Sequence, residues 1–221
     1  MTLPAHYDPG SKSREFYEEA TQLWSDWRQT RIVCQDSEPG IHLLKERYDS
    51  SIGKTVTRHG FLTALSLEEE SHHYVLKHER THTAPRTDRV RLYQHTRANL
   101  SPLFFIYRDD PNETAEFLLH FNGKETRKGV LSHRGNVSLE LASTFDREFM
   151  NDFCASFDQK HVLIADGHHR YEASRLLHNE NKDPSINSSA VLAYLVPESS
   201  EGLIVHATHR GLHDLDHFDD D

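Results

Sequence analysis

The segment VLIADGHHRYEA, Val162–Ala173, carries the strongest indication of the fold of this chain. Its first four residues are apolar and uninterrupted, a pattern typical of a buried strand. They lead directly into Asp166 and Gly167, and a helix-like pattern follows from Tyr171. The segment therefore predicts a strand, a polar turn and a helix in succession. In α/β proteins such a junction lies at the carboxyl edge of the sheet, where ligands usually bind.

The turn itself, Asp166–Arg170, combines groups that bind anions. Gly167 permits a positive φ or the close approach of a ligand to the backbone. The following helix directs its amide N–H groups and the positive end of its dipole at the same point. Arg170 can donate to a phosphate in a bidentate manner, and His168 and His169 add further donors. Asp166 is the kind of carboxylate that holds Mg²⁺. These residues predict a phosphate-binding turn, although no Walker GxxxxGK[ST] pattern occurs in the chain.

Two other interpretations of the turn are open. In the first, Asp166 only caps the helix and the two histidines are solvated. In the second, His168 and His169 build a dinuclear metal site, but adjacent residues diverge on a helix and do not readily share one metal ion. The number of donors on a single turn favours phosphate binding over both alternatives.

A second polar block occupies Val75–Phe105. It begins at a strand end with Lys77-His78-Glu79 and finishes with Asn-Leu-Ser-Pro ahead of an apolar strand. Within a chain of formal net charge −10 it holds a basic island, Arg80, Arg86, Arg89, Arg91 and Arg97. Three of them, Arg86, Arg89 and Arg97, either line an anionic ligand or belong to a solvated helix face paired with Asp88. Glu79 beside His78 has the ingredients of a general base, a carboxylate that accepts a hydroxyl proton.

The remaining sequence alternates between helical and extended patterns. An amphipathic stripe predicts a helix over residues 13–29, and the turn residues of Asp49–Lys54 predict a β-hairpin. Gly60, within that hairpin, indicates a bulge or a close backbone approach. Further helices are expected over 85–98, 114–121 and 144–157, and further strands over 101–107, 129–133 and 189–195. The pattern indicates an α/β (α+β) fold, a single domain with a mixed sheet.

Composition excludes several classes of function. A chain of 221 residues can bury a sizeable core. Its acidic balance argues against a nucleic-acid or anionic-membrane surface, because both require clustered cations. Cys34 and Cys154 are isolated, so neither a structural zinc site nor a disulfide framework is expected. Without a signal-peptide core or an apolar run of membrane-spanning length, we expect a cytoplasmic protein.

Taken together, the two polar blocks resemble a known family. KHERT…P…DR…L…ANLSP…Y followed by IADGHHRYEA is similar to the bacterial and archaeal domain of unknown function 1015. That family lies in the ParB/sulfiredoxin-like superfamily, so the resemblance implies a ParB/sulfiredoxin-like nucleotide-binding core. The similarity also covers FYEEATQLWSDW, GKTVTRHGFLTAL and the late ATHR. We therefore expect a family domain over residues 13–215, a flexible N-terminus over 1–12 and an acidic tail over 216–221, in a member that is truncated at both ends.

The resemblance to the free serine kinases of archaea implies roles for individual residues. Those enzymes phosphorylate L-serine to O-phosphoserine, so ATP or ADP with Mg²⁺ is the implied cofactor set. Glu79 matches their catalytic glutamate, and Thr208 and His209 resemble a substrate-side Thr-His pair. Sulfiredoxin's catalytic cysteine is replaced here by His168, so sulfinic-acid reduction is not expected. The implied catalytic residues are Glu79, Asp166 and His169, the nucleotide-binding residues are Gly167, His168, His169 and Arg170, and the metal ligand is Asp166.

Three hypotheses follow for function. The first is a nucleotide-dependent phosphotransferase acting on a small hydroxyl substrate, with free L-serine the leading acceptor. The alternative is a nucleotide-binding regulatory module, or an inactive truncated paralogue with little or no catalysis. The third is a metal-dependent hydrolase that uses the histidines. In the first two cases the partners are a nucleotide and a small molecule, without nucleic acid or membrane, and self-association into a homo-oligomer is left open.

Overall fold

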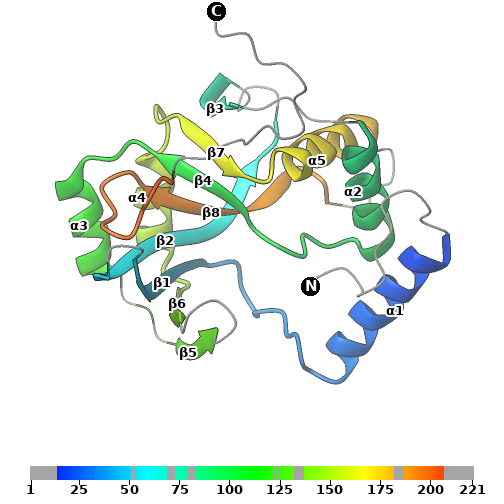
Figure 1. Cartoon of the computed structure of the whole chain (residues 1–221), viewed down its shortest axis with the longest axis horizontal. Helices are drawn as coiled ribbons and strands as arrows, with labels where there is room; N and C mark the ends of the chain where they lie inside the picture. Colours follow the sequence, from blue (N-terminus) through cyan, green and yellow to red (C-terminus); the bar gives the residue numbers. More distant parts are fainter. Residues whose placement is uncertain are drawn as a thin grey trace, which may run out of the picture.

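The computed structural model describes residues 14–50, 53–68, 73–78, 83–121, 123, 125–131, 137–181 and 187–206. Within these ranges five helices surround one mixed sheet of eight strands (Figure 1). The helices are α1 Arg14–Gln29, α2 Thr83–Thr96, α3 Pro111–His120, α4 Arg147–Ala155 and α5 His168–Glu180. The strands are β1 Ile41–Asp49, β2 Thr55–Ser66, β3 Val75–Leu76, β4 Leu103–Tyr107, β5 Glu125–Leu131, β6 Val137–Thr144, β7 Val162–Asp166 and β8 Ala190–Pro197. The prediction of a single domain with a mixed α/β fold is confirmed.

The strand order is β3-β7-β4-β8-β2-β1-β6-β5. Two of the neighbouring pairs are parallel, β3 with β7 and β4 with β8, and the other pairs are antiparallel. Because β3 runs parallel to β7, their carboxyl ends lie at the same edge of the sheet. Because β4 runs antiparallel to β7, the start of β4 lies at that edge as well, with Phe104 opposite Asp166.

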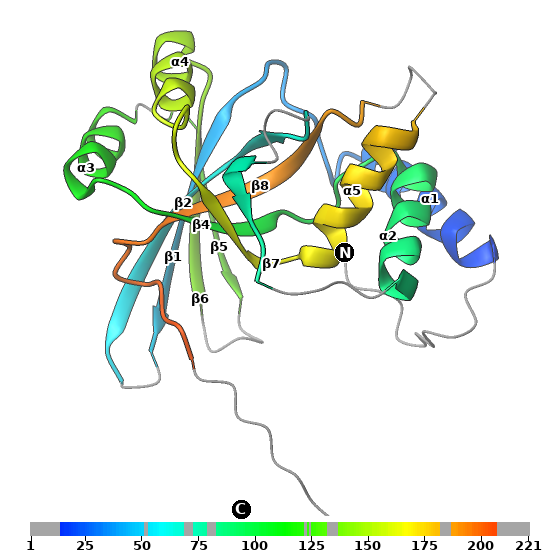
Figure 2. The same cartoon turned by 90° about the horizontal axis from the view of Figure 1, so that it is seen from above.

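The helices cover the sheet in two groups (Figure 2). At one end, α3 and α4 contribute phenylalanines, and Phe153 packs on Phe61 of β2 with ring centroids 4.7 Å apart. At the other end, Tyr171 of α5 packs edge-on against Phe105 of β4 at 6.4 Å. Helix α2 lies against α5, and α1 lies outside α2. The packing of Tyr171 against Phe105 anchors α5, and therefore the turn that precedes it, to the sheet.

The predicted β-hairpin is confirmed as β1 and β2, which pair from His42 opposite Leu62 to Asp49 opposite Thr55. The structure shows a close approach at Gly60, one of the two features that its position in the strand predicted. A Cβ built there meets Tyr194 Cε2 at 2.2 Å, so the ring of Tyr194 occupies the space above the glycine. The glycine leaves room for a tyrosine of the neighbouring strand β8.

Several predicted boundaries were wrong, and one strand was not predicted. The helix predicted over 114–121 is α3, which begins at Pro111, and the strand predicted over 129–133 is β5, which begins at Glu125. Thr144, placed in a predicted helix, ends β6, and α4 begins at Arg147 behind the cap residue Asp146. The Asp146 carboxylate accepts from the amides of Glu148 and Phe149, which explains the later start. Helix α5 begins at His168 and not at Tyr171, so the two histidines lie in its first turn. Strand β6 has an alternation of apolar and polar residues from Val137 to Leu141 that was overlooked.

Candidate functional site

The junction of β7 and α5 has the strand, turn and helix that the sequence predicted. Asp166 is the last residue of β7, and α5 runs for 13 residues from His168. Gly167 is the N-cap residue, with φ 103° and ψ 23°, and it supplies no side-chain cap. The first intrahelical bond runs from the Tyr171 amide to the Gly167 carbonyl at 2.9 Å. The amides of residues 168–170 therefore precede the first helical bond and face the end of the helix, where an anion is stabilised.

Arg170 ties this turn to the second polar block. Its Nη1 donates to Ser101 Oγ at 2.8 Å and to the Pro102 carbonyl at 2.7 Å. Its Nη2 donates to Asp166 Oδ2 at 2.6 Å. The guanidinium lies directly above Gly167, since a Cβ at that glycine would approach Nη2 at 2.9 Å. A glycine is therefore required at this position both for the positive φ and for the placement of Arg170.

His168 connects the turn to the end of β3. It is 5% exposed, and its ring stands perpendicular to that of His78 with centroids 4.4 Å apart. The backbone N–H of His78 points to His168 Nε2 at 3.5 Å, a long hydrogen bond in which the imidazole nitrogen accepts. One residue earlier, Lys77 forms an ion pair with Glu172 of α5. The structure thus gives His168 a role in holding β3 to α5, while its predicted role in nucleotide binding stays a prediction.

The sheet topology is what gathers these groups. The end of β3, the end of β7 and the start of β4 meet at one edge, so the Lys77-His78 and Ser101-Pro102 parts of the second block flank Asp166–Arg170. The contribution of Ser101 and Pro102 was not predicted. Their position directly before an apolar strand was the available signal, but nothing in the sequence linked them to an arginine 69 positions later.

Of the other predicted site residues, one lies in the described part of the chain and three lie outside it. Glu79, Thr208 and His209 lie outside the described residues. His169 is half-buried in the first turn of α5. In the described residues no cluster of three or more His, Cys, Asp or Glu side chains has the arrangement of a metal site.

One exposed carboxylate at this edge, Asp166, suits a magnesium ion of the kind that accompanies a nucleotide. The Asp166 side chain is 73% exposed, and the contact with Arg170 uses its Oδ2 atom. Mg²⁺ is often held by one or two carboxylates together with substrate phosphates and water, so a dedicated protein cage is not required. Asp166 is therefore the residue at this edge that would hold such an ion.

A protein-family model described as Protein of unknown function (DUF1015) matches residues 1–221. The chain belongs to the DUF1015 family. Searches of curated proteins and of solved structures gave no significant match. The resemblance to this family, inferred from the two polar blocks, is thereby confirmed, whereas a ParB/sulfiredoxin-like core and a similarity to serine kinases stay predictions. Within the described part of this DUF1015 chain, no helix has the length and apolar character needed to cross a membrane.

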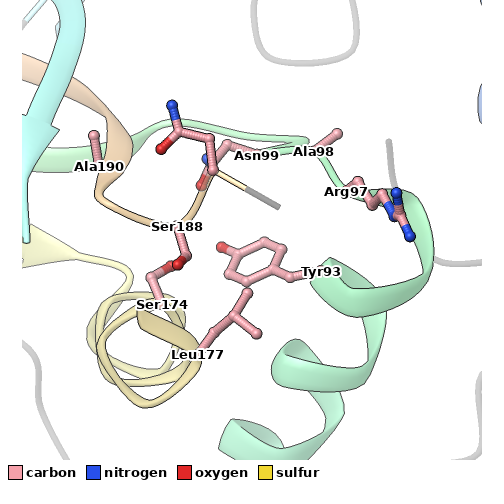
Figure 3. Close-up of a pocket in the computed structure, with 9 residues that line it drawn as sticks. Tyr93, Arg97, Ala98, Asn99, Ser174, Leu177, Ser188 and Ala190 are labelled. Atoms are coloured by element: carbon pink, nitrogen blue, oxygen red, sulfur yellow. The ribbon is translucent and has the colours of Figure 1, made fainter. Parts of the chain in front are cut away.

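Beside this edge, the DUF1015 chain has a small pocket between α2, α5 and the start of β8 (Figure 3). Its lining combines hydroxyl, amide and apolar side chains: Tyr93, Arg97, Ala98, Asn99, Ser174, Leu177, Asn187, Ser188 and Ala190. Burial raises the pKa of the Tyr93 hydroxyl, while Ser174, Arg170 and Arg89 act in the opposite direction. Arg89 and Arg170 therefore make the electrostatic potential at this hydroxyl more positive. Arg89 belongs to the predicted basic island, so part of that island acts on the pocket.

Proposed function

We propose that this DUF1015 protein is a nucleotide-dependent phosphotransferase that phosphorylates the hydroxyl group of a small substrate, with free L-serine as the leading acceptor. The observation that supports this most directly is the convergence of the two polar blocks at one edge of the sheet. Arg170 bonds Ser101 and Pro102, and His168 faces His78, so both blocks adjoin a single turn. Phosphoryl transfer depends mainly on positioning and on charge neutralisation, which such a turn provides.

The donor phosphate is assigned to the start of α5. The amides of residues 168–170 and the dipole of a 13-residue helix stabilise negative charge there, and Gly167 allows the phosphate to approach the backbone. His169 adds a donor in the first turn. Asp166 would hold Mg²⁺, which would supply charge neutralisation for the phosphate groups.

The acceptor chemistry is assigned to Glu79, which follows His78 in the chain. In this proposal its carboxylate takes the proton of the acceptor hydroxyl as the hydroxyl oxygen attacks the terminal phosphorus. The new P–O bond replaces the bond between that phosphorus and the donor's bridging oxygen, and the shortened nucleotide leaves. Thr208 and His209 are assigned to the acceptor side. These three assignments rest on the family resemblance.

A nucleotide-binding regulatory module is the second candidate, and the engagement of Arg170 favours it. The guanidinium already bonds Asp166, Ser101 and Pro102, and its side chain is 19% exposed. With three protein groups bonded, the guanidinium has fewer N–H groups left to donate to a phosphate in the transition state. In this candidate the turn binds nucleotide and little or no transfer follows.

The decisive experiment incubates the full chain with ATP or ADP, Mg²⁺ and a panel of hydroxyl-bearing amino acids, and follows phosphorus by NMR. We expect a new phosphomonoester signal that depends on both the acceptor and the nucleotide. Glu79→Gln should lower turnover by about 100-fold or more, because it removes the base. Glu201→Gln is the matched control, since Glu201 is an exposed partner of Lys54.

Thermal-shift titration separates the candidates, because a ligand that binds the folded state raises its stability whether or not chemistry follows. A nucleotide-dependent shift without phosphoryl transfer would support the regulatory module. The absence of any shift would overturn both candidates. Undiminished turnover in Glu79→Gln would remove that residue from the mechanism, and turnover without nucleotide that chelation abolishes would instead indicate a metal-dependent hydrolase.

A further inference from the structure

The pocket between α2, α5 and β8 ends on two buried hydroxyl groups. Tyr93 of α2 is 7% exposed and Ser174 of α5 is 5% exposed. In Figure 3 the ring of Tyr93 reaches across the pocket, with its hydroxyl toward Ser174 and Ser188. Ser174 acts on the pKa of the Tyr93 hydroxyl as a hydrogen-bonding neighbour, so the two hydroxyls lie close together. Neither hydroxyl has a hydrogen bond of standard geometry to any of the described residues. Buried hydroxyls normally have well-formed hydrogen bonds, so this weakly bonded pair at the base of one pocket has the capacity to bind a polar occupant.

The size of the pocket restricts that occupant. Its volume of about 40 Å³ is room for roughly three water molecules. Pockets that enclose a nucleotide or a drug-sized ligand are several times larger, about 300–1,000 Å³. The occupant is therefore a group of a few heavy atoms, and the nucleotide assigned to the start of α5 does not belong here.

The charges around the pocket determine the chemistry of the occupant. The lining residues include no carboxylate and one cationic residue, Arg97, whose guanidinium points away from Tyr93 and Ser174 in Figure 3. Arg97 has a φ of 51°, a left-handed conformation at the end of α2 that is uncommon for a residue with a side chain. Asp166 offsets part of the charge of Arg170, but Arg89 and Arg170 together still act as positive groups on the Tyr93 hydroxyl. Hydroxyl donors in a positive field suit an anionic oxygen acceptor better than a cation.

We propose that this pocket binds a small carboxylate, whose oxygens accept hydrogen bonds from Tyr93 Oη and Ser174 Oγ. Asn99, Asn187 and Ser188 also line the pocket and carry groups able to donate, and Leu177 and Ala190 add apolar contacts for a short carbon chain. The site is separate from the phosphate-binding turn. It does not depend on the proposed phosphotransfer, and it can be tested without nucleotide.

Sodium acetate is a suitable probe, titrated into the isotope-labelled full chain while sodium chloride is lowered to hold ionic strength constant. We expect saturable shifts of the amides at the end of α2, in α5 and around residues 187–190. For a ligand of four heavy atoms the Kd should be on the order of millimolar. Acetamide has the same shape without the charge, and we expect it to bind at least about tenfold more weakly.

Tyr93→Phe and Ser174→Ala each remove one hydroxyl while preserving most of the packing, and each should weaken acetate binding about tenfold. Tyr171→Phe is the matched control. Tyr171 is a buried tyrosine of α5, the helix of Ser174, and does not line the pocket, so the acetate affinity of this variant should be unchanged. Tyr93→Phe should fold at least as stably as the parent chain, because it deletes a buried hydroxyl without a standard hydrogen bond. A loss of acetate binding in Tyr93→Phe would therefore not be explained by unfolding of the variant.

Three results would overturn the proposal. They are the absence of saturable shifts with acetate, equal binding of acetamide, and unchanged acetate affinity in both Tyr93→Phe and Ser174→Ala. The first result would leave a pocket occupied by water. The second would show that the ligand's charge is not recognised, and the third would show that acetate binds elsewhere.

Discussion

Arg170 donates through Nη1 to the hydroxyl of Ser101 at 2.8 Å, and this bond between residues 69 positions apart is one of those that join the two polar blocks. The same guanidinium bonds Asp166 at the end of β7. The relationship exists because β4 is antiparallel to β7, which brings the residues before β4 to the turn that follows β7. Arg170 is thus both a structural link and a member of the proposed phosphate-binding turn.

Replacement of Arg170 by lysine should destabilise the fold and weaken nucleotide binding. A lysine has one ammonium group and cannot reproduce the fork that reaches Ser101, Pro102 and Asp166 together. We expect a loss of about 1–2 kcal/mol in the free energy of unfolding, measured by urea denaturation. Ser101→Ala should cost less, about 0.5–1.5 kcal/mol, because it removes one bond. Equal stability of all three proteins would show that the guanidinium contacts are incidental.

Gly167→Ala should impair the turn more than a comparable change elsewhere. A Cβ at Gly167 would lie 2.9 Å from Arg170 Nη2, and the φ of 103° is unfavourable for any L side chain. We expect a loss of stability of about 1–3 kcal/mol together with weaker nucleotide binding in a thermal-shift titration. Gly53→Ala is the control, since Gly53 also has a positive φ, 75°, but has open space around it. It should lose about 1 kcal/mol and bind nucleotide normally.

Gly60→Ala should destabilise the sheet through overpacking. The added methyl group would lie 2.2 Å from Tyr194 Cε2 and 2.8 Å from Val196 Cγ2, so strand β8 or the tyrosine ring must move. The expected loss is about 1–3 kcal/mol in the free energy of unfolding. Gly129→Ala, in strand β5, meets nothing within 4 Å and should change stability by no more than about 0.5 kcal/mol. Similar losses in the two variants would contradict the close approach at Gly60.

Tyr171→Phe should make the protein less sensitive to alkaline pH. Burial raises the pKa of the Tyr171 hydroxyl to about 12, compared with about 10 in an unfolded chain. The folded state therefore keeps its proton longer, and the stability that this provides is complete below pH 10 and is lost as the pH rises toward 12. Between pH 9 and pH 12, the parent chain should lose up to about 2–3 kcal/mol more than Tyr171→Phe in urea unfolding.

The other buried tyrosines with raised pKa values are present in both proteins, so their titration cancels in this comparison; they are Tyr17, Tyr93, Tyr107 and Tyr194. Parallel stability curves for the parent chain and Tyr171→Phe would show that this hydroxyl is not protected by the fold.

Local patterns were sufficient for those parts of the fold that depend on neighbouring residues. The apolar run of β7 followed by Gly167, and the turn residues between β1 and β2, indicated their structures because strand burial and turn geometry are set by a few consecutive side chains. The boundaries of α4 and α5 were less predictable. They depend on which carboxylate caps a helix and on whether a glycine takes a positive φ, and the helical pattern alone does not distinguish these cases.

The sequence by itself determined that the chain has a mixed α/β fold and that a polar turn and a helix follow the apolar run of β7. Tertiary structure alone decided which distant residues accompany that turn. Ser101 reaches Arg170 and His78 reaches His168 because strand order and strand direction bring three segments to one edge of the sheet. Those features follow from non-local pairing. The pairing of Tyr93 with Ser174 in one pocket has the same origin, since it depends on the packing of α2 against α5.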